Sequence, residues 1–170
     1  MSLDSRIATL NISGGEKTYE PIPNDSTQGR QEALMLLIKQ MNADVLCLQE
    51  VSQYVDADGV THSPLEAINE AGDYSASHYG KTVSMEAHLQ VKKDIMVKGI
   101  FNDWWNWSKG NTIHARYAFS RLGDHEKTGV PRNIPLYMPL SYEGTRDTEP
   151  RFALLGRQKE APFPFITSLH

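Results

Sequence analysis

The chain has 170 residues, 39% of them hydrophobic and 22% charged, and its formal net charge is −4 at pH 7. This composition excludes a disordered chain and is typical of one globular domain with its own core, which we place over residues 1–170. The negative charge argues against binding nucleic acid by general phosphate neutralisation, so any phosphate chemistry requires a local site. No stretch approaches the ~18 apolar residues of a membrane span, and no basic-then-apolar leader begins the chain, so we expect a cytoplasmic protein.

The first elements are predicted to be a strand, a helix and a second strand. Residues 5–12 have the composition of a strand, and a glycine-containing loop follows them. From about Ser26 the apolar period becomes helical, and Asn42 can end the helix in the left-handed conformation. Four apolar residues at i, i+3, i+4 and i+7 form the stripe expected to face the core: Leu34, Leu37, Ile38 and Met41.

The most informative segment is an apolar run that stops at a carboxylate. Residues 45–48 fill both faces of the second strand, which predicts a central strand covered on both sides, with Cys47 as a buried and inert thiol. Gln49 and Glu50 are expected to emerge at its C-terminal end. A carboxylate there costs free energy to desolvate unless it is paired or binds a cation. Two interpretations stay open, a metal ligand and a satisfied structural acid.

The strand–helix–strand topology is expected to bring three polar residues together. Both parallel strands of such a unit end at the same edge of the sheet, where the helix begins. Asn11 ends the first strand and Glu50 the second, so their side chains should be neighbours. Arg30 lies one turn before Leu34 on the core-facing stripe, and a guanidinium there needs a carboxylate or phosphate partner. This convergence favours a functional site.

The central part of the chain has weaker patterns. We expect residues 52–72 to be mostly loop with a short helix after Pro64, and residues 73–79 to form a strand. The densest aromatic cluster runs from Trp104 to Trp107. It has two interpretations, stacking on bases or sugars and pinning a long loop to the body of the domain.

The last third of the chain again predicts strands. Residues 110–119 alternate between apolar and polar, which predicts a half-buried strand with His114 facing solvent or a covering helix. Residues 123–148 are polar and contain prolines, so we expect a surface loop. Residues 151–157 and 163–170 are two apolar segments joined by a short polar stretch, which predicts a hairpin.

Five segments, in this order, resemble the endonuclease/exonuclease/phosphatase superfamily, the fold of the pancreatic-type deoxyribonucleases. The segment from Asp44 to Val51 is similar to that family's pattern of aspartate, apolar run, glutamine and glutamate. The other four resemble its asparagine strand, its Gly-Asn strand, its arginine strand and its histidine strand. They are residues 9–15, 110–117, 149–155 and 165–170.

The resemblance implies roles for the matching residues. Glu50 would bind a divalent cation, Mg²⁺ or Mn²⁺, since hard cations take oxygen ligands. Asn11 would orient the phosphate or a water beside it, and His170 would contact the scissile phosphate. Arg116 and Arg151 keep two interpretations, contacts to substrate phosphates and structural ion pairs across the sandwich. The implied reaction is hydrolysis of a phosphodiester or phosphomonoester by an activated water.

The sequence departs from the family pattern mainly in what it lacks. The family's second half carries a Gly-Asp-x-Asn motif and a final Ser-Asp-His motif, which supply the aspartate that activates water and a further histidine. Gly72-Asp73 lacks the asparagine, and Gly123-Asp124-His125 precedes His170 in a polar loop. We therefore expect these 170 residues to be an incomplete domain with little or no hydrolytic activity by themselves.

The expected architecture is α/β: the N-terminal half of a DNase I-like two-sheet sandwich, a mixed sheet flanked by helices. The expected substrate is a phosphate ester, and a nucleic acid, a phospholipid head group and a sugar phosphate all remain open. Half a sandwich exposes an apolar sheet face, so a dimer partner or second chain is expected to cover it. The alternative function is a non-catalytic binding module that uses the same half-sandwich.

Overall fold

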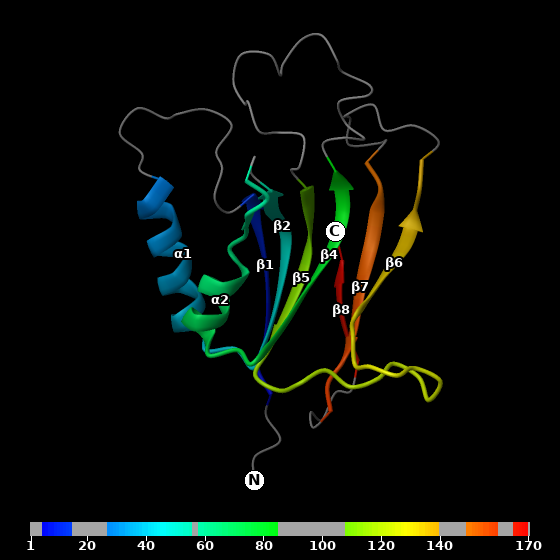
Figure 1. Cartoon of the computed structure of the whole chain (residues 1–170). Coiled ribbons are helices and arrows are strands. Elements are labelled where there is room, and N and C mark those ends of the chain that lie inside the picture. The colour runs from blue at the N-terminus through cyan, green and yellow to red at the C-terminus, as the bar shows by residue number, and fades with distance from the viewer. Residues whose placement is uncertain are drawn as a thin grey trace.

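Two sheets and two helices make up the described part of the protein (Figure 1). The computed structural model describes residues 5–14, 27–55, 58–84, 108–139, 149–159 and 165–169. Two features singled out in the sequence, the Trp104–Trp107 cluster and His170, lie outside the described residues.

The first sheet is mixed and contains most of the strands. Its order is β1-β2-β5-β4, and the two-residue β3 pairs with β2 outside this path. β1 and β2 are parallel, whereas β5 is antiparallel to both of its neighbours. The bounds are Ile7–Gly14 for β1, Val45–Val55 for β2, Thr61–His62 for β3, Ala76–Ser84 for β4 and Ser108–Ala115 for β5.

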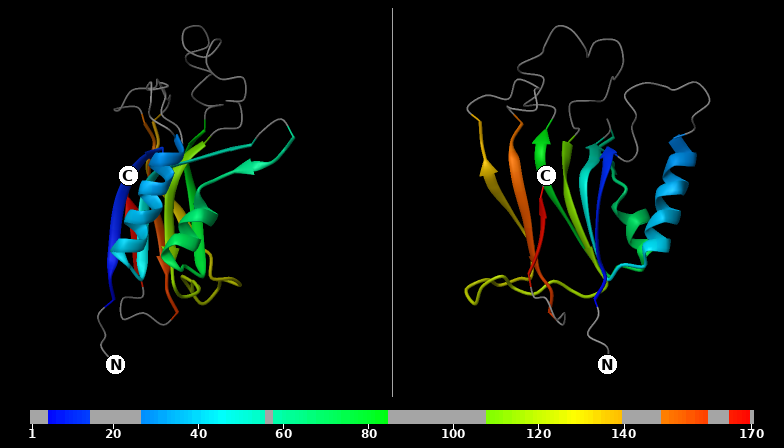
Figure 2. Two further views of the ribbon diagram at one scale, coloured as in Figure 1. Left: turned by 90° about the vertical axis from the view of Figure 1, so that its left-hand side faces the viewer. Right: turned by 180° about the vertical axis from the view of Figure 1, so that it is seen from behind.

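The second sheet is antiparallel and has the order β6-β7-β8. Its strands are Arg132–Tyr137, Arg151–Arg157 and Phe165–Leu169. The helices α1 (Thr27–Met41) and α2 (Leu65–Gly72) lie on the other side of the first sheet (Figures 1 and 2). The result is three layers, helices, mixed sheet and antiparallel sheet, so the predicted α/β sandwich architecture is confirmed.

The predicted strand–helix–strand unit is also confirmed, with one change on the helix. Ile38 is fully buried, and Asn42, which directly follows α1, has a left-handed φ of 45° as expected. Leu37, however, is 42% exposed, and Met35 packs against the core instead. These two residues flank the apolar stripe on opposite sides of the helix, so the packing of α1 decides which of them is buried.

β2 is buried on both faces, as its apolar run predicts. Leu46 and Leu48 pack into a core between the first sheet and the helices. Val45 and Cys47 pack into a second core between the two sheets. Burial raises the pKa of the Cys47 thiol to about 11, which keeps it protonated and unreactive at neutral pH.

Several predicted boundaries are wrong. β2 continues past Glu50 to Val55, so the carboxylate lies within the strand and not at its end. β5 is fully buried from residue 110 to 115 and not half-buried, because α2 covers one of its faces and the second sheet covers the other. β6 forms inside the segment 123–148, which was expected to be loop throughout. The hairpin of β7 and β8 is confirmed.

Candidate active site

Glu50 occupies a β-bulge in the middle of β2. Leu48 pairs with Thr112 and Val51 pairs with Gly110, so Gln49 and Glu50 together oppose the single residue Asn111. The φ of Glu50 is 56°, a left-handed conformation that a residue with a Cβ adopts only at a cost of about 1–2 kcal/mol. A bulge of this kind breaks the alternation of a strand and re-aims a side chain. The bulge thus gives the carboxylate a direction that a regular strand would not.

The side chain of Glu50 meets that of Asn11, as the parallel topology predicts. Asn11 pairs with Gln49 across the β1–β2 ladder, and its Nδ2 donates a hydrogen bond of 3.0 Å to Glu50 Oε1. Both residues retain solvent access. The hydrogen bond fixes one carboxylate oxygen beside β1.

Gln49 joins three strands beneath this pair. Its Nε2 donates to Thr9 Oγ1 on β1 at 3.1 Å and to Ser168 Oγ on β8 at 3.0 Å. Both Gln49 and Ser168 are buried. This link holds the end of β8 against the Asn11–Glu50 edge, and His170 follows Ser168 by two residues. Sequence reasoning assigned no role to Gln49, although a polar residue after a two-sided apolar run is a signal for one.

Asn111, opposite the bulge, carries an unsatisfied buried oxygen. Its Nδ2 donates to the carbonyl oxygen of Phe152 on β7 at 3.3 Å. Its Oδ1 has no hydrogen-bond partner among the described residues, and the side chain is fully buried. An unpaired buried acceptor costs about 1–3 kcal/mol unless a water or ion satisfies it. The backbone of Asn111 lies opposite Gln49 and Glu50 in the ladder, and amide and carboxylate oxygens are ligands that a hard cation takes.

An ion cluster lies at the same end of the two sheets. Lys109 on β5 is opposite Ser52, two residues beyond Glu50. Its Nζ lies 2.6 Å from Glu149 Oε1, and Glu149 Oε2 lies 3.8 Å from Arg151 Nη1. We call Lys109, Glu149 and Arg151 the Glu149 cluster. In it Arg151 makes an ion pair, one of its two interpretations, and the cluster adds two charged residues that sequence reasoning missed.

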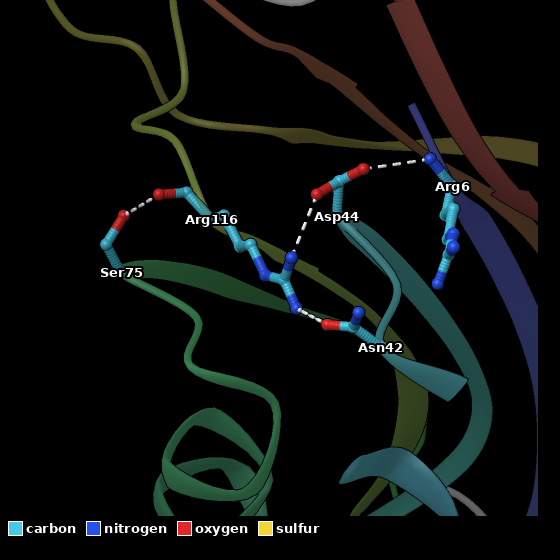
Figure 3. Close-up of polar contacts among 5 residues, drawn as sticks. All are labelled: Arg6, Asn42, Asp44, Ser75 and Arg116. Atoms are coloured by element: carbon cyan, nitrogen blue, oxygen red, sulfur yellow. Dashed lines mark hydrogen bonds and ion pairs between the residues drawn. The ribbon is translucent and has the colours of Figure 1, made fainter. Parts of the chain in front are cut away.

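Arg116 lies at the opposite end of the first sheet, in the structural ion pair that was its second interpretation. Its Nη1 is 3.0 Å from Asp44 Oδ1, and its Nη2 donates to Asn42 Oδ1 (Figure 3). Asp44 Oδ2 also accepts from the backbone nitrogen of Arg6 at 2.9 Å, and Arg116 O accepts from Ser75 Oγ at 2.6 Å. The structure therefore does not bring Arg116 to the Asn11–Glu50 edge. Asp44 directly precedes β2 and Glu50 is its middle residue, so the two acids lie six residues apart along the strand.

Arg30 lies in the first turn of α1, and α1 starts at the end of the first sheet toward which β1 and β2 run (Figure 1). Its side chain lies outside what the structure describes, so its expected contact stays a prediction. Within the described residues, no three His, Cys, Asp or Glu side chains gather in a way that could hold a metal ion. A Mg²⁺ site does not require three, because this ion keeps several waters and takes one or two carboxylates plus substrate oxygens.

His114 faces the covering helix, one of its two expected directions. Its Nδ1 lies 2.7 Å from Asn69 Oδ1 on α2, and its Nε2 lies 2.9 Å from Thr112 Oγ1. Burial lowers its pKa from 6.5 to about 3, so the ring is neutral at pH 7. With both nitrogens partnered and no exposed surface, His114 is a structural residue.

Solved structures show where this fold occurs elsewhere. No protein-family model and no curated protein sequence matches the chain. An endonuclease/exonuclease/phosphatase from Beutenbergia cavernae DSM 12333 superposes with a TM-score of 0.60 at 18% identity, over 98% of this chain and 38% of that one. An endonuclease/exonuclease/phosphatase family protein from Leptotrichia buccalis C-1013-b gives 0.52 at 13% identity, over 98% of this chain and 55% of that one.

At these identities the likeness shows the fold, and it confirms the fold that the sequence motifs predicted. Almost all of this chain is covered, but it spans only 38% and 55% of the two similar structures. In the described part of this chain, no helix has the length and apolar character to cross a membrane.

Proposed function

We propose that this chain is the N-terminal part of a divalent-metal-dependent phosphoesterase of the endonuclease/exonuclease/phosphatase type. The observation that carries the proposal is Glu50, held in a left-handed bulge and hydrogen-bonded to Asn11 at an edge that also carries Lys109 and Arg151. Strained backbone that aims a carboxylate at such an edge is expected at functional positions.

The residues present fit a hard cation. Glu50 supplies a carboxylate, and Asn111 supplies a buried amide oxygen without a partner among the described residues. In this proposal Glu50 binds Mg²⁺ or Mn²⁺. A bound cation of this type polarises a phosphoryl oxygen and stabilises the charge that develops on it.

The chain's own residues would position the phosphate ester. Asn11 fixes Glu50 Oε1 and so orients the other carboxylate oxygen. Arg151 provides a guanidinium for the non-bridging oxygens of the phosphate, and Arg30 at the start of α1 is proposed to face the same edge. Gln49 anchors β8, and we propose that His170, just beyond that strand, contacts the scissile phosphate.

The proposed enzyme is larger than these 170 residues. The similar structures extend well beyond the part that this chain covers. The aspartate and second histidine that the family motifs supply have no equivalent in this sequence. We therefore expect these residues to bind the metal weakly and to hydrolyse phosphate esters slowly or not at all.

Metal binding is the first test, because it does not require activity. Calorimetric titration with Mn²⁺ should show one site in the unmodified chain and none in Glu50→Gln. Glu66→Gln is the matched control, since Glu66 is an exposed acid on α2, and it should bind Mn²⁺ as the unmodified chain does. Equal affinity in the unmodified chain and Glu50→Gln would refute the ligand assignment.

Activity is the second test and needs a polypeptide with the missing motifs. Magnesium-dependent hydrolysis of a generic phosphodiester and a generic phosphomonoester should then be measured for Glu50→Ala. Removing a metal ligand should lower the rate by several orders of magnitude. A rate within about threefold of the unmodified enzyme would contradict the proposal.

A non-catalytic interaction module is the second candidate, favoured by the outer face of the second sheet. β6 and β8 carry large apolar side chains exposed to solvent, which are Ile134, Leu136, Phe165 and Leu169. Such a patch is typical of a surface that a partner covers. A chain that self-associates or binds a partner through this face and shows no Mn²⁺ site would favour this candidate.

A further inference from the structure

The Glu149 cluster combines two cations with one carboxylate. Lys109 and Glu149 are mostly buried, with side chains 18% and 12% exposed, whereas Arg151 is 30% exposed. The cluster bridges the two sheets, since Lys109 belongs to β5 and Arg151 begins β7. Its members carry two positive charges and one negative charge.

The Arg116–Asp44 pair at the other end of the first sheet provides the contrast. There one guanidinium meets one carboxylate and the amide oxygen of Asn42, and the pair is neutral. That arrangement is sufficient to join strands. In the Glu149 cluster two cations share one carboxylate. A lysine ammonium carries three N–H groups, and its ion pair with a single carboxylate oxygen occupies at most one of them. The shared carboxylate leaves the ammonium with capacity for a further anion.

The register of β2 and β5 places Lys109 near Glu50, where an anion could contact both residues' surroundings. The two residues lie on neighbouring strands, and Lys109 is opposite a residue two positions beyond Glu50. Two strand residues span about 6.6 Å and adjacent strands lie about 4.8 Å apart. These spacings place the two backbones about 8 Å apart, a gap that the lysine side chain, the glutamate side chain and a tetrahedral anion between them can span together.

We propose that Lys109 binds the phosphate of the substrate, and that Glu149 is a positioning residue that holds Lys109 beside Arg151 to form an anion subsite next to Glu50. The identity of the anion as substrate phosphate rests on the proposed function. The anion subsite itself does not depend on a metal at Glu50, so the two can be tested separately.

Binding of inorganic phosphate to the chain in the presence of EDTA tests the subsite. Calorimetry should show at least about tenfold weaker binding for Lys109→Met, because a charge-assisted hydrogen bond is lost. Lys109→Arg keeps the charge and should bind within about threefold of the unmodified chain. Lys39→Met is the control, since Lys39 is an exposed lysine in the last turn of α1, and it should have no effect.

Glu149→Gln tests the positioning role through the sign of its effect. The substitution makes the cluster more positive, so electrostatics alone would strengthen phosphate binding. If Glu149 positions Lys109, binding should instead weaken by about threefold or more. Stronger binding would mean that Glu149 only competes with phosphate for the ammonium, which would overturn the positioning role.

A measurement on the unmodified chain covers the case in which Lys109→Met fails to fold. Phosphate should slow the chemical acetylation of Lys109 by about fivefold or more, measured by mass spectrometry, and should leave the rate at Lys39 unchanged. Equal rates at Lys109 with and without phosphate would overturn the proposal and leave a structural ion pair only. Loss of Mn²⁺ binding in Glu50→Gln with intact phosphate binding supports the subsite. The reverse pattern, a Mn²⁺ site without phosphate binding, supports the metal site alone.

Discussion

The left-handed backbone at Glu50 predicts that glycine stabilises this position more than alanine does. A residue with a Cβ pays about 1–2 kcal/mol at a φ of 56°, and glycine pays nothing there. Glycine loses about 0.5–1 kcal/mol more conformational entropy on folding than alanine. The difference leaves Glu50→Gly more stable than Glu50→Ala by about 0.5–1 kcal/mol. Both variants lose the hydrogen bond from Asn11, so it cancels in the comparison.

Urea unfolding of the two variants measures this difference directly, and the melting temperatures should differ by about 2 °C for a chain of this size. Thr167 on β8 is the control position, since it is exposed and has no positive φ. At this control position Thr167→Ala should be more stable than Thr167→Gly by about 0.5–1 kcal/mol. If alanine is at least as stable as glycine at position 50, the bulge is not strained and the structural argument for a functional carboxylate fails.

Other predictions concern the residues around the site. Arg116→Met should lower the free energy of unfolding by about 1–2 kcal/mol and should leave phosphate binding unchanged. This loss is smaller than that for a fully buried ion pair, because about a quarter of each side chain in the Arg116–Asp44 pair is exposed to solvent. Gln49→Leu should cost about 2 kcal/mol in urea unfolding, because it leaves the buried hydroxyl of Ser168 unpaired; a loss below about 0.5 kcal/mol would contradict the anchoring role. The lowered pKa of His114 makes the unfolded state bind one more proton between pH 6.5 and about 3. Stability is therefore complete above pH 6.5 and falls below it by up to about 1.4 kcal/mol per pH unit, and unfolding curves of His114→Gln should lack this component.

Part of the candidate site could be predicted from sequence patterns, and part could not. Asn11 and Glu50 are neighbours as predicted, because β1 and β2 are parallel and their register pairs Asn11 with Gln49. Neither residue ends its strand as expected, since β1 continues to Gly14 and β2 to Val55. Glu50 itself lies in a bulge that no periodicity indicates, since β2 resumes its alternation afterwards and continues to Val55. Arg116 was left between two interpretations, and its ion pair with Asp44 depends on a contact between residues 72 positions apart.

Lys109 and Glu149 had no signal in the sequence. They are far apart along the chain, Lys109 on β5 and Glu149 two residues before β7, so only the stacking of β5 and β7 brings a lysine and a glutamate together. Arg151 drew attention through its resemblance to the family's arginine strand, but its neighbour Glu149 did not. Ion clusters between sheets depend on the register of two separate ladders, which local patterns do not encode.

By itself, the sequence determined the α/β class, the strand–helix–strand unit and the burial of residues 45–48 on both faces, because apolar period and topology are local properties with few solutions. It also determined that Asn11 and Glu50 share an edge. Tertiary structure alone decided that Glu50 adopts a left-handed bulge within β2, that Met35 and not Leu37 packs against the core, and that Lys109 forms an ion pair with Glu149. Each of these depends on how one layer packs against another, and that packing fixes side-chain positions only after the layers have formed.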